Sequence, residues 1–89
     1  MLINWTRVQE LRDEIGHDSF AEVVAVFLDE SDTVIARPSL TAEDLHFLRG
    51  AALNLGFAEL AEACSRTADR HVVTALYAAS KASLLAEAI

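Results

Sequence analysis

The sequence predicts an all-α protein: an up-and-down antiparallel four-helix bundle with a short extra helix at its N-terminus. Apolar residues recur every three or four positions along most of the chain. No run alternates polar and β-branched residues, as a half-buried strand would. Gly16, Pro38 and Gly56 divide the chain into segments of helical length, and short connections favour antiparallel neighbours. Residues 1–89 are expected to form one domain.

The first two predicted helices are bounded by capping and breaking residues. Asn4 can cap a helix over residues 4–15, which Gly16 would end. A second helix is expected from about residue 19 to residue 37, because Pro38 cannot continue it. The expected inward residues of the first are Trp5, Val8, Leu11 and Ile15. Those of the second are Phe20, Val23, Val24, Phe27, Leu28, Ser31, Val34 and Ile35.

The third predicted helix opens at Thr41 with a near capping box, in which Asp44 replaces the usual Glu or Gln. It is expected to run to Leu55 and to end at Gly56. Its inward residues are expected to be Leu45, Leu48, Ala52 and Leu55.

The last two predicted helices are separated near residues 69–71, although no Gly or Pro stands there. A single helix from residue 58 onward would leave apolar residues outside so small a globule, and Asp69 can cap a fifth helix. The fourth helix is expected over residues 58–68, with Leu60, Ala61, Cys64 and Ala68 inward. The fifth is expected to direct inward Val72 or Val73, Leu76, Tyr77, Ser80 and Leu84.

Composition narrows the possible partners and the compartment. The net charge is −7 and the seven basic residues form no stripe, so neither nucleic acid nor an anionic membrane is an expected partner. Cys64, the single cysteine, cannot form an internal disulfide and is expected in the core. Residues 1–10 do not resemble a signal peptide, and the apolar run 23–28 is too short to cross a bilayer. A cytoplasmic protein is expected.

Residues 46–50, His-Phe-Leu-Arg-Gly, carry the candidate chemistry. His46 falls outside the inward stripe of its helix, and Arg49 and Gly50 lie one turn later on the same face. Helical side chains lean toward the N-terminus, so a side chain at position 50 would cover the imidazole. Glycine inside a helix costs about 1 kcal/mol relative to alanine. Access to His46 would explain that cost, and so would close packing of a neighbouring helix.

An exposed histidine with space around it and a cation beside it suits a phosphoryl carrier. Neutral imidazole is nucleophilic near neutral pH. Phosphoryl transfer depends mainly on positioning and charge stabilisation, and Arg49 supplies a fixed positive charge. The alternative is an ordinary solvated helix residue, as we expect for His17 and His71.

Residues 46–64 resemble the signature of the histidine-phosphotransfer (HPt) domains of bacterial phosphorelays. The shared pattern is His46, Leu48, a basic residue at Arg49, Gly50, two small residues, Leu55, Gly56, Leu60 and Cys64. Residues 5–16 and 20–28 resemble the family's leading helix and first bundle helix more loosely. The resemblance implies the same four-helix bundle.

The resemblance also implies a function in two-component signal transduction. His46 would accept a phosphoryl group on Nε2 from a receiver-domain aspartate and pass it to another response regulator. Arg49 would steady the phosphoryl oxygens, and Gly50 would leave access to the ring. The expected partners are receiver domains and a hybrid histidine kinase, and the receiver would supply Mg²⁺, so no cofactor is expected on this chain.

Two positions depart from the family pattern. Ala51 stands where a small polar residue is often found. Ala68, with Asp69 beside it, stands where many members carry a Glu or Gln that hydrogen-bonds the other imidazole nitrogen. The sequence therefore leaves open which group orients the His46 ring.

Apolar residues of the first and third helices are expected to form the docking patch for a receiver: Val8, Leu11, Ile15 and Leu53. A monomer is expected because one bundle would enclose all the apolar stripes. Two other function classes compete with phosphotransfer: an adaptor that binds receivers or kinases without transfer, and a purely structural bundle. An autonomous kinase is excluded, because the chain has no glycine-rich nucleotide loop and no second domain.

Overall fold

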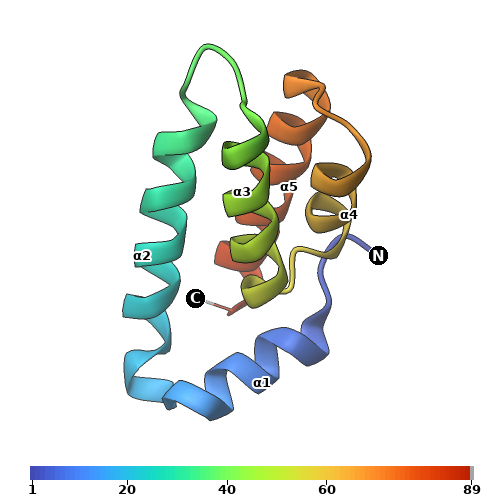
Figure 1. Ribbon diagram of the computed structural model, residues 1–89. Coiled ribbons are helices and arrows are strands. Elements are labelled where there is room, and N and C mark those ends of the chain that lie inside the picture. Colours follow the sequence, from blue (N-terminus) through green and yellow to red (C-terminus); the bar gives the residue numbers. More distant parts are fainter. Residues whose placement is uncertain (89) are drawn as a thin grey trace.

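The computed structural model describes residues 1–88, which form five helices and no strand: α1 (Trp5–Ile15), α2 (His17–Ile35), α3 (Ala42–Leu55), α4 (Ala58–Arg66) and α5 (Arg70–Ala88). The prediction of an all-α protein is confirmed. In Figure 1, α2 and α3 run side by side in opposite directions, α4 follows on the other side of α3, and α5 lies behind α3. α1 lies across one end of the other four helices and packs on both α2 and α3.

Capping side chains set the starts of α1 and α3, as predicted. The Asn4 side chain accepts a hydrogen bond from the Arg7 backbone N–H at 3.2 Å. At Thr41 the capping box is complete: its hydroxyl accepts from the Asp44 N–H at 3.1 Å, and the Asp44 carboxylate accepts from the Thr41 N–H at 3.0 Å. The hydrogen bond from the Thr41 backbone N–H lowers the pKa of Asp44, and the nearby Arg37 charge lowers it further. Burial of the carboxylate acts in the opposite direction but does not cancel these effects.

The break between α4 and α5 is confirmed, but α4 ends at Arg66, two residues earlier than predicted. The Thr67 hydroxyl accepts a hydrogen bond from the Asp69 N–H at 3.0 Å, and the Asp69 carboxylate accepts from the His71 N–H at 2.9 Å. Such side-chain bonds compete with the helical backbone and end the helix without a glycine or proline. Ala68, predicted to point inward, is exposed in this segment.

Most of the predicted inward residues are buried or half-buried. Besides Ala68, the exception is Trp5, which is 42% exposed. Its place in the core is taken by Ile3, whose exposure is 4%. The Asn4 N–H donates to the Gly56 carbonyl at 2.7 Å, which anchors the segment before α1 against the α3–α4 turn.

Gly56 is the one position where the fold needs both the conformation and the size of glycine. Its φ is +79°, in the left-handed region that other residues adopt at a cost. A Cβ atom there would lie 2.7 Å from the Asn4 carbonyl oxygen and 3.2 Å from a Val8 methyl. Gly56 therefore lets α1 approach the turn closely, and this places α1 beside the C-terminal half of α3.

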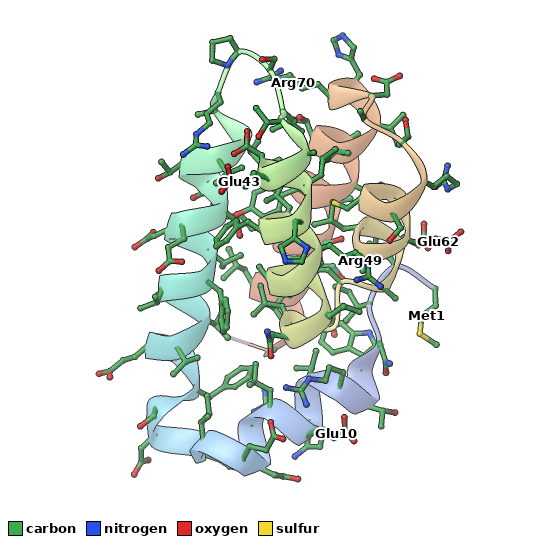
Figure 2. All side chains as sticks on the ribbon, in the orientation of Figure 1. Met1, Glu10, Glu43, Arg49, Glu62 and Arg70 are labelled. Carbon is green, nitrogen blue, oxygen red and sulfur yellow. The ribbon has the colours of Figure 1, made fainter. Side chains whose placement is uncertain are left out.

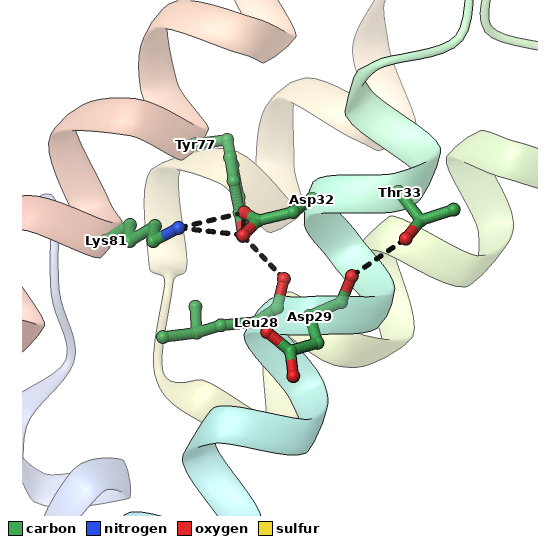
Figure 3. A network of polar contacts seen from close by, with 6 residues as sticks. All are labelled: Leu28, Asp29, Asp32, Thr33, Tyr77 and Lys81. Carbon is green, nitrogen blue, oxygen red and sulfur yellow. Dashed lines mark hydrogen bonds and ion pairs between the residues drawn. The ribbon is translucent and has the colours of Figure 1, made fainter.

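Polar side chains join α5 to α2 through a small network (Figure 3). The Tyr77 hydroxyl lies 2.5 Å from an Asp32 carboxylate oxygen and 3.1 Å from the Leu28 carbonyl, and the Lys81 ammonium donates to both Asp32 oxygens at 2.8 and 3.0 Å. Burial, followed by the hydrogen bond to Asp32, raises the pKa of Tyr77. Burial opposes ionisation of Asp32, but the bonds from Lys81 and Tyr77 still lower its pKa.

We expect the Tyr77 phenol to resist ionisation until the protein unfolds. Its folded pKa is raised above the ordinary value of 10.0, so its contribution to stability is full below pH 10.0 and is lost as the pH rises further. Tyr77 is the only tyrosine, so ultraviolet absorbance of phenolate reports it alone. Phenolate absorbance and loss of helical circular dichroism should therefore rise together. Phenolate formation at pH 10.0 with the helical signal intact would contradict this role of the network. Asp32→Asn should let the Tyr77 phenol ionise at a lower pH than in the wild type, because the carboxylate raises its pKa.

Candidate functional site

His46 lies in the second turn of α3 and is exposed, as predicted. The buried residues of α3 are Asp44, Leu48, Ala51, Ala52 and Leu55. They occupy one face of the helix, and a residue at position 46 falls on the opposite face. The core packing of α3 thus holds its backbone in place while the imidazole faces solvent.

Open space lies over Gly50, one turn after His46. A Cβ atom built on Gly50 meets no side chain, and no backbone of another element, within 4 Å. The alternative that Gly50 permits close packing of a neighbouring helix is therefore wrong. The expectation that a side chain at position 50 would cover the imidazole is wrong for a methyl group, because the His46 ring does not come within 4 Å of it. The space above Gly50 is instead open to a molecule approaching His46 from outside.

Two replacements of Gly50 should show that stability of the fold and access to His46 respond differently to the size of the side chain. Gly50→Ala should raise the free energy of unfolding by about 0.5–1 kcal/mol, because alanine favours the helix and its methyl group meets open space. Gly50→Leu should slow phosphate transfer roughly tenfold or more, because its side chain leans toward His46. Urea unfolding and a transfer time course measure the two effects.

Ala42→Leu is the matched control for Gly50→Leu. Ala42 is exposed on the same face of α3, four residues before His46, and a side chain there leans away from the ring. It should leave transfer unchanged. Equal transfer rates for Gly50→Leu and Ala42→Leu would show that the open space has no role in access.

Arg49 supplies a cation that the fold itself does not use. It is exposed, and none of the ion pairs among residues 1–88 includes it. Figure 2 shows its side chain on the side of α3 that faces α4. An unpaired guanidinium one turn from an imidazole is suited to bind an anion held on that imidazole.

Cys64 of α4 is buried, as predicted, with 8% of its surface exposed. Burial raises the pKa of its thiol, and the positive charge of Arg49 opposes this only in part. A neutral, buried thiol is poorly suited to nucleophilic chemistry. The structure therefore gives Cys64 a packing role in the core.

The predicted docking patch is only partly at the surface. Val8 and Leu11, expected both on the inward face of α1 and in the docking patch, are only 3% and 6% exposed, because α1 turns this face onto α2 and α3. Their inward position is confirmed, and their place in the docking patch is wrong. Ile15 is half-buried. Leu53 is 51% exposed and lies two turns after His46 on the same face of α3.

The sequence did not identify two polar residues that shape the surface beside Leu53. The Asn54 side chain donates a hydrogen bond to the Gly50 carbonyl at 3.0 Å. The Arg7 guanidinium donates to the Asn54 carbonyl at 3.2 Å, and this bond ties α1 to α3. The same guanidinium pairs within α1 with Glu14 at 3.2 Å. A hollow of about 180 Å³ opens there, lined in part by Arg7 and Leu53. Their separation in sequence, 47 positions between Arg7 and Asn54, leaves no local pattern to detect.

The remaining candidate residues contribute no second site. Ala68 follows the end of α4 and has no side-chain group that could hydrogen-bond the His46 ring. His17 is exposed beside Asp13 at 3.9 Å, and His71 is exposed at the start of α5. Within residues 1–88, no three His, Cys, Asp or Glu side chains are grouped so as to hold a metal ion, and no helix is long and apolar enough to span a membrane.

Comparisons with protein-family models, with curated proteins and with solved structures found no match for this chain. The function must therefore be inferred from the site itself. That site consists of an exposed imidazole on a well-packed helix, an open surface over Gly50 and a cation at Arg49.

Proposed function

We propose that this protein is a histidine-containing phosphotransfer protein that carries a phosphoryl group on His46. The observation that carries the proposal is the open surface at His46. The ring is exposed, no other helix comes within 4 Å of the position that a Cβ atom would take on Gly50, and Arg49 takes part in no ion pair among residues 1–88. A catalytic domain can therefore approach the ring closely.

The arrangement of the helices supports this proposal. We interpret α2 to α5 as an up-and-down antiparallel four-helix bundle, with α1 as the extra helix at one end. α3 packs against α1, α2 and α4, so its backbone is held from several sides. A rigid helix presents His46 to its partner at low entropic cost.

The proposed reaction needs little from this chain beyond a nucleophile and a charge. The Nε2 lone pair of neutral His46 attacks the phosphorus of a receiver aspartyl phosphate. A P–N bond forms, the P–O bond to the aspartate breaks, and the carboxylate leaves with the electron pair. The ring proton stays on Nδ1. The receiver supplies Mg²⁺ and returns its own aspartate to the ionised state, and the reverse reaction delivers the phosphoryl group to a second receiver.

Arg49 would stabilise the phosphorylated ring, because the added group is an anion and the guanidinium is an exposed cation one turn away. Ala68 offers no hydrogen bond to Nδ1, so we assign the orientation of the ring to solvent and to the docked receiver. The docking surface would centre on His46 and Gly50 and would extend to Leu53 and Ile15. In this proposal the protein is a cytoplasmic monomer, phosphorylated through a hybrid histidine kinase and its receiver.

A transfer assay tests the proposal. The protein is incubated with a receiver domain that carries phosphate on its aspartate, and the chain is then separated and examined for phosphate. The expected product is labile in acid and stable in alkali, as a phosphoramidate is. Binding of the receiver without any transfer would identify the protein as an adaptor and would contradict the proposal.

A further inference from the structure

A second surface, on the far side of the fold from the outward face of α3, lies between α2 and α5. Two adjoining hollows of about 210 and 410 Å³ share Asp32, Lys81 and Leu85 in their lining, and we call the two together the α2–α5 groove. Its apolar lining includes Ala21, Ala25, Leu28, Ile35, Ala78 and Leu85. No residue of α3 lines it, so the groove is separate from the His46 surface.

Small side chains leave this groove open. α2 packs mainly on α3 and α1, and α5 packs mainly on α4. Ala21 and Ala25 of α2 line one hollow and Ala78 and Ala82 of α5 line the other, and side chains this short leave space between the helices. The Lys81–Asp32 ion pair and the Tyr77 hydroxyl bridge the two helices (Figure 3). These polar side chains join the two helices where the hollows meet, and the rest of the groove presents mainly apolar side chains.

The groove has the length of a short helix. Its lining on α2 extends from Ala21 to Ile35, which corresponds to about 21 Å at the rise of an α-helix. The outward face of α5 continues the apolar surface, because Ala75, Ala79 and Ala82 are exposed and Leu85 is 41% exposed. An amphipathic helix of about 14 residues would cover this surface.

The charges beside the groove identify the kind of helix that fits. Asp18, Glu22 and Asp29 follow the spacing i, i+4, i+11, so they form one stripe on the side of α2 that carries Ala21 and Ala25. All three are exposed, and no ion pair among residues 1–88 includes them. α2 contains no Lys or Arg to offset them.

We propose that the α2–α5 groove binds an amphipathic helix of another protein, with its apolar face on the groove and Lys or Arg residues along the edge beside α2. A second copy of this chain fits less well. It carries a net charge of −7, and pairing through this face would bring two acidic stripes together. The proposal does not depend on phosphotransfer at His46.

The test uses a synthetic peptide of about 14 residues, stapled into a helix, with leucine and alanine on one face and lysines at i, i+4 and i+11 along its edge. The control peptide has glutamate in place of each lysine. Titration into the isotope-labelled protein is followed by backbone amide NMR shifts. The lysine peptide should shift amides of α2 and α5 but not those around His46, and it should bind roughly tenfold more tightly than the glutamate peptide.

Variants of the protein complete the test. Replacement of Asp18, Glu22 and Asp29 by lysine should reverse the preference between the two peptides, because all three residues are exposed and their loss does not affect the core. These replacements should leave phosphate acceptance unchanged. Equal or absent binding of the peptides, or shifts confined to α3, would overturn the proposal. Concentration-dependent shifts of α2 and α5 without peptide would also overturn it and assign the groove to a second copy.

Discussion

His46→Gln should abolish phosphate acceptance and leave the fold intact. Glutamine has no nucleophilic ring nitrogen, so no P–N bond can form. Because His46 is exposed and lies opposite the buried face of α3, its replacement removes no core contact. The variant should therefore match the wild type in helical circular dichroism and remain within about 0.5 kcal/mol of its free energy of unfolding. The measurement is incubation with a phosphorylated receiver, followed by quantification of acid-labile phosphate.

The other two histidines provide matched controls. His17 and His71 are both exposed, one at the start of α2 and one at the start of α5, and neither has a glycine one turn later. His17→Gln and His71→Gln should accept phosphate as the wild type does. If either control lost acceptance while His46→Gln retained it, the assignment of the site to α3 would be wrong.

Arg49→Ala should shift the phosphate equilibrium from this protein toward the receiver. The guanidinium can stabilise the phosphorylated ring but gains nothing from the neutral ring. One charge-assisted contact contributes about 1–2 kcal/mol at such an exposed site, which corresponds to a shift of roughly 5–30-fold. Arg49→Lys should retain most of the effect, because a point charge suffices for one oxygen, although bidentate geometry is lost.

The ratio of the two phosphorylated species at equilibrium measures this effect in the wild type and in both variants. Binding of the unphosphorylated receiver should change less, because no phosphoryl charge is then present. The exposed Arg66 of α4, which lies 3.9 Å from Glu62, offers a control cation, and Arg66→Ala should leave the ratio unchanged. An unchanged ratio in Arg49→Ala would mean that Arg49 only solvates α3.

Most of the helical architecture could be predicted because the signals are local. Apolar periodicity identified the buried faces of α2 and α3, and the capping box at Thr41 fixed the start of α3. The errors lie where distant contacts or side-chain hydrogen bonds decide. Trp5 is exposed because Ile3 occupies the core, and α4 ends early because Thr67 and Asp69 bond to the backbone.

The candidate site was predictable only in part, for a similar reason. The exposure of His46 and Arg49 follows from their positions on α3. The burial of Val8 and Leu11 depends on how α1 packs across the end of the other helices, which Gly56 permits through its close approach to Asn4. The sequence carries no local pattern for such a contact. The α2–α5 groove was likewise not predictable, because it depends on how two helices far apart in the sequence are placed beside each other.

The position of the phosphate on the chain tests the proposed function most directly. Wild-type protein would be phosphorylated by a receiver, digested without exposure to acid, and sequenced by fragmentation mass spectrometry. We predict one phosphorylated peptide, with the added mass on His46 and none on His17, His71 or any hydroxyl residue. Phosphate at another residue, or no phosphate after prolonged incubation with receivers that phosphorylate a known carrier, would contradict the proposal that His46 carries a phosphoryl group.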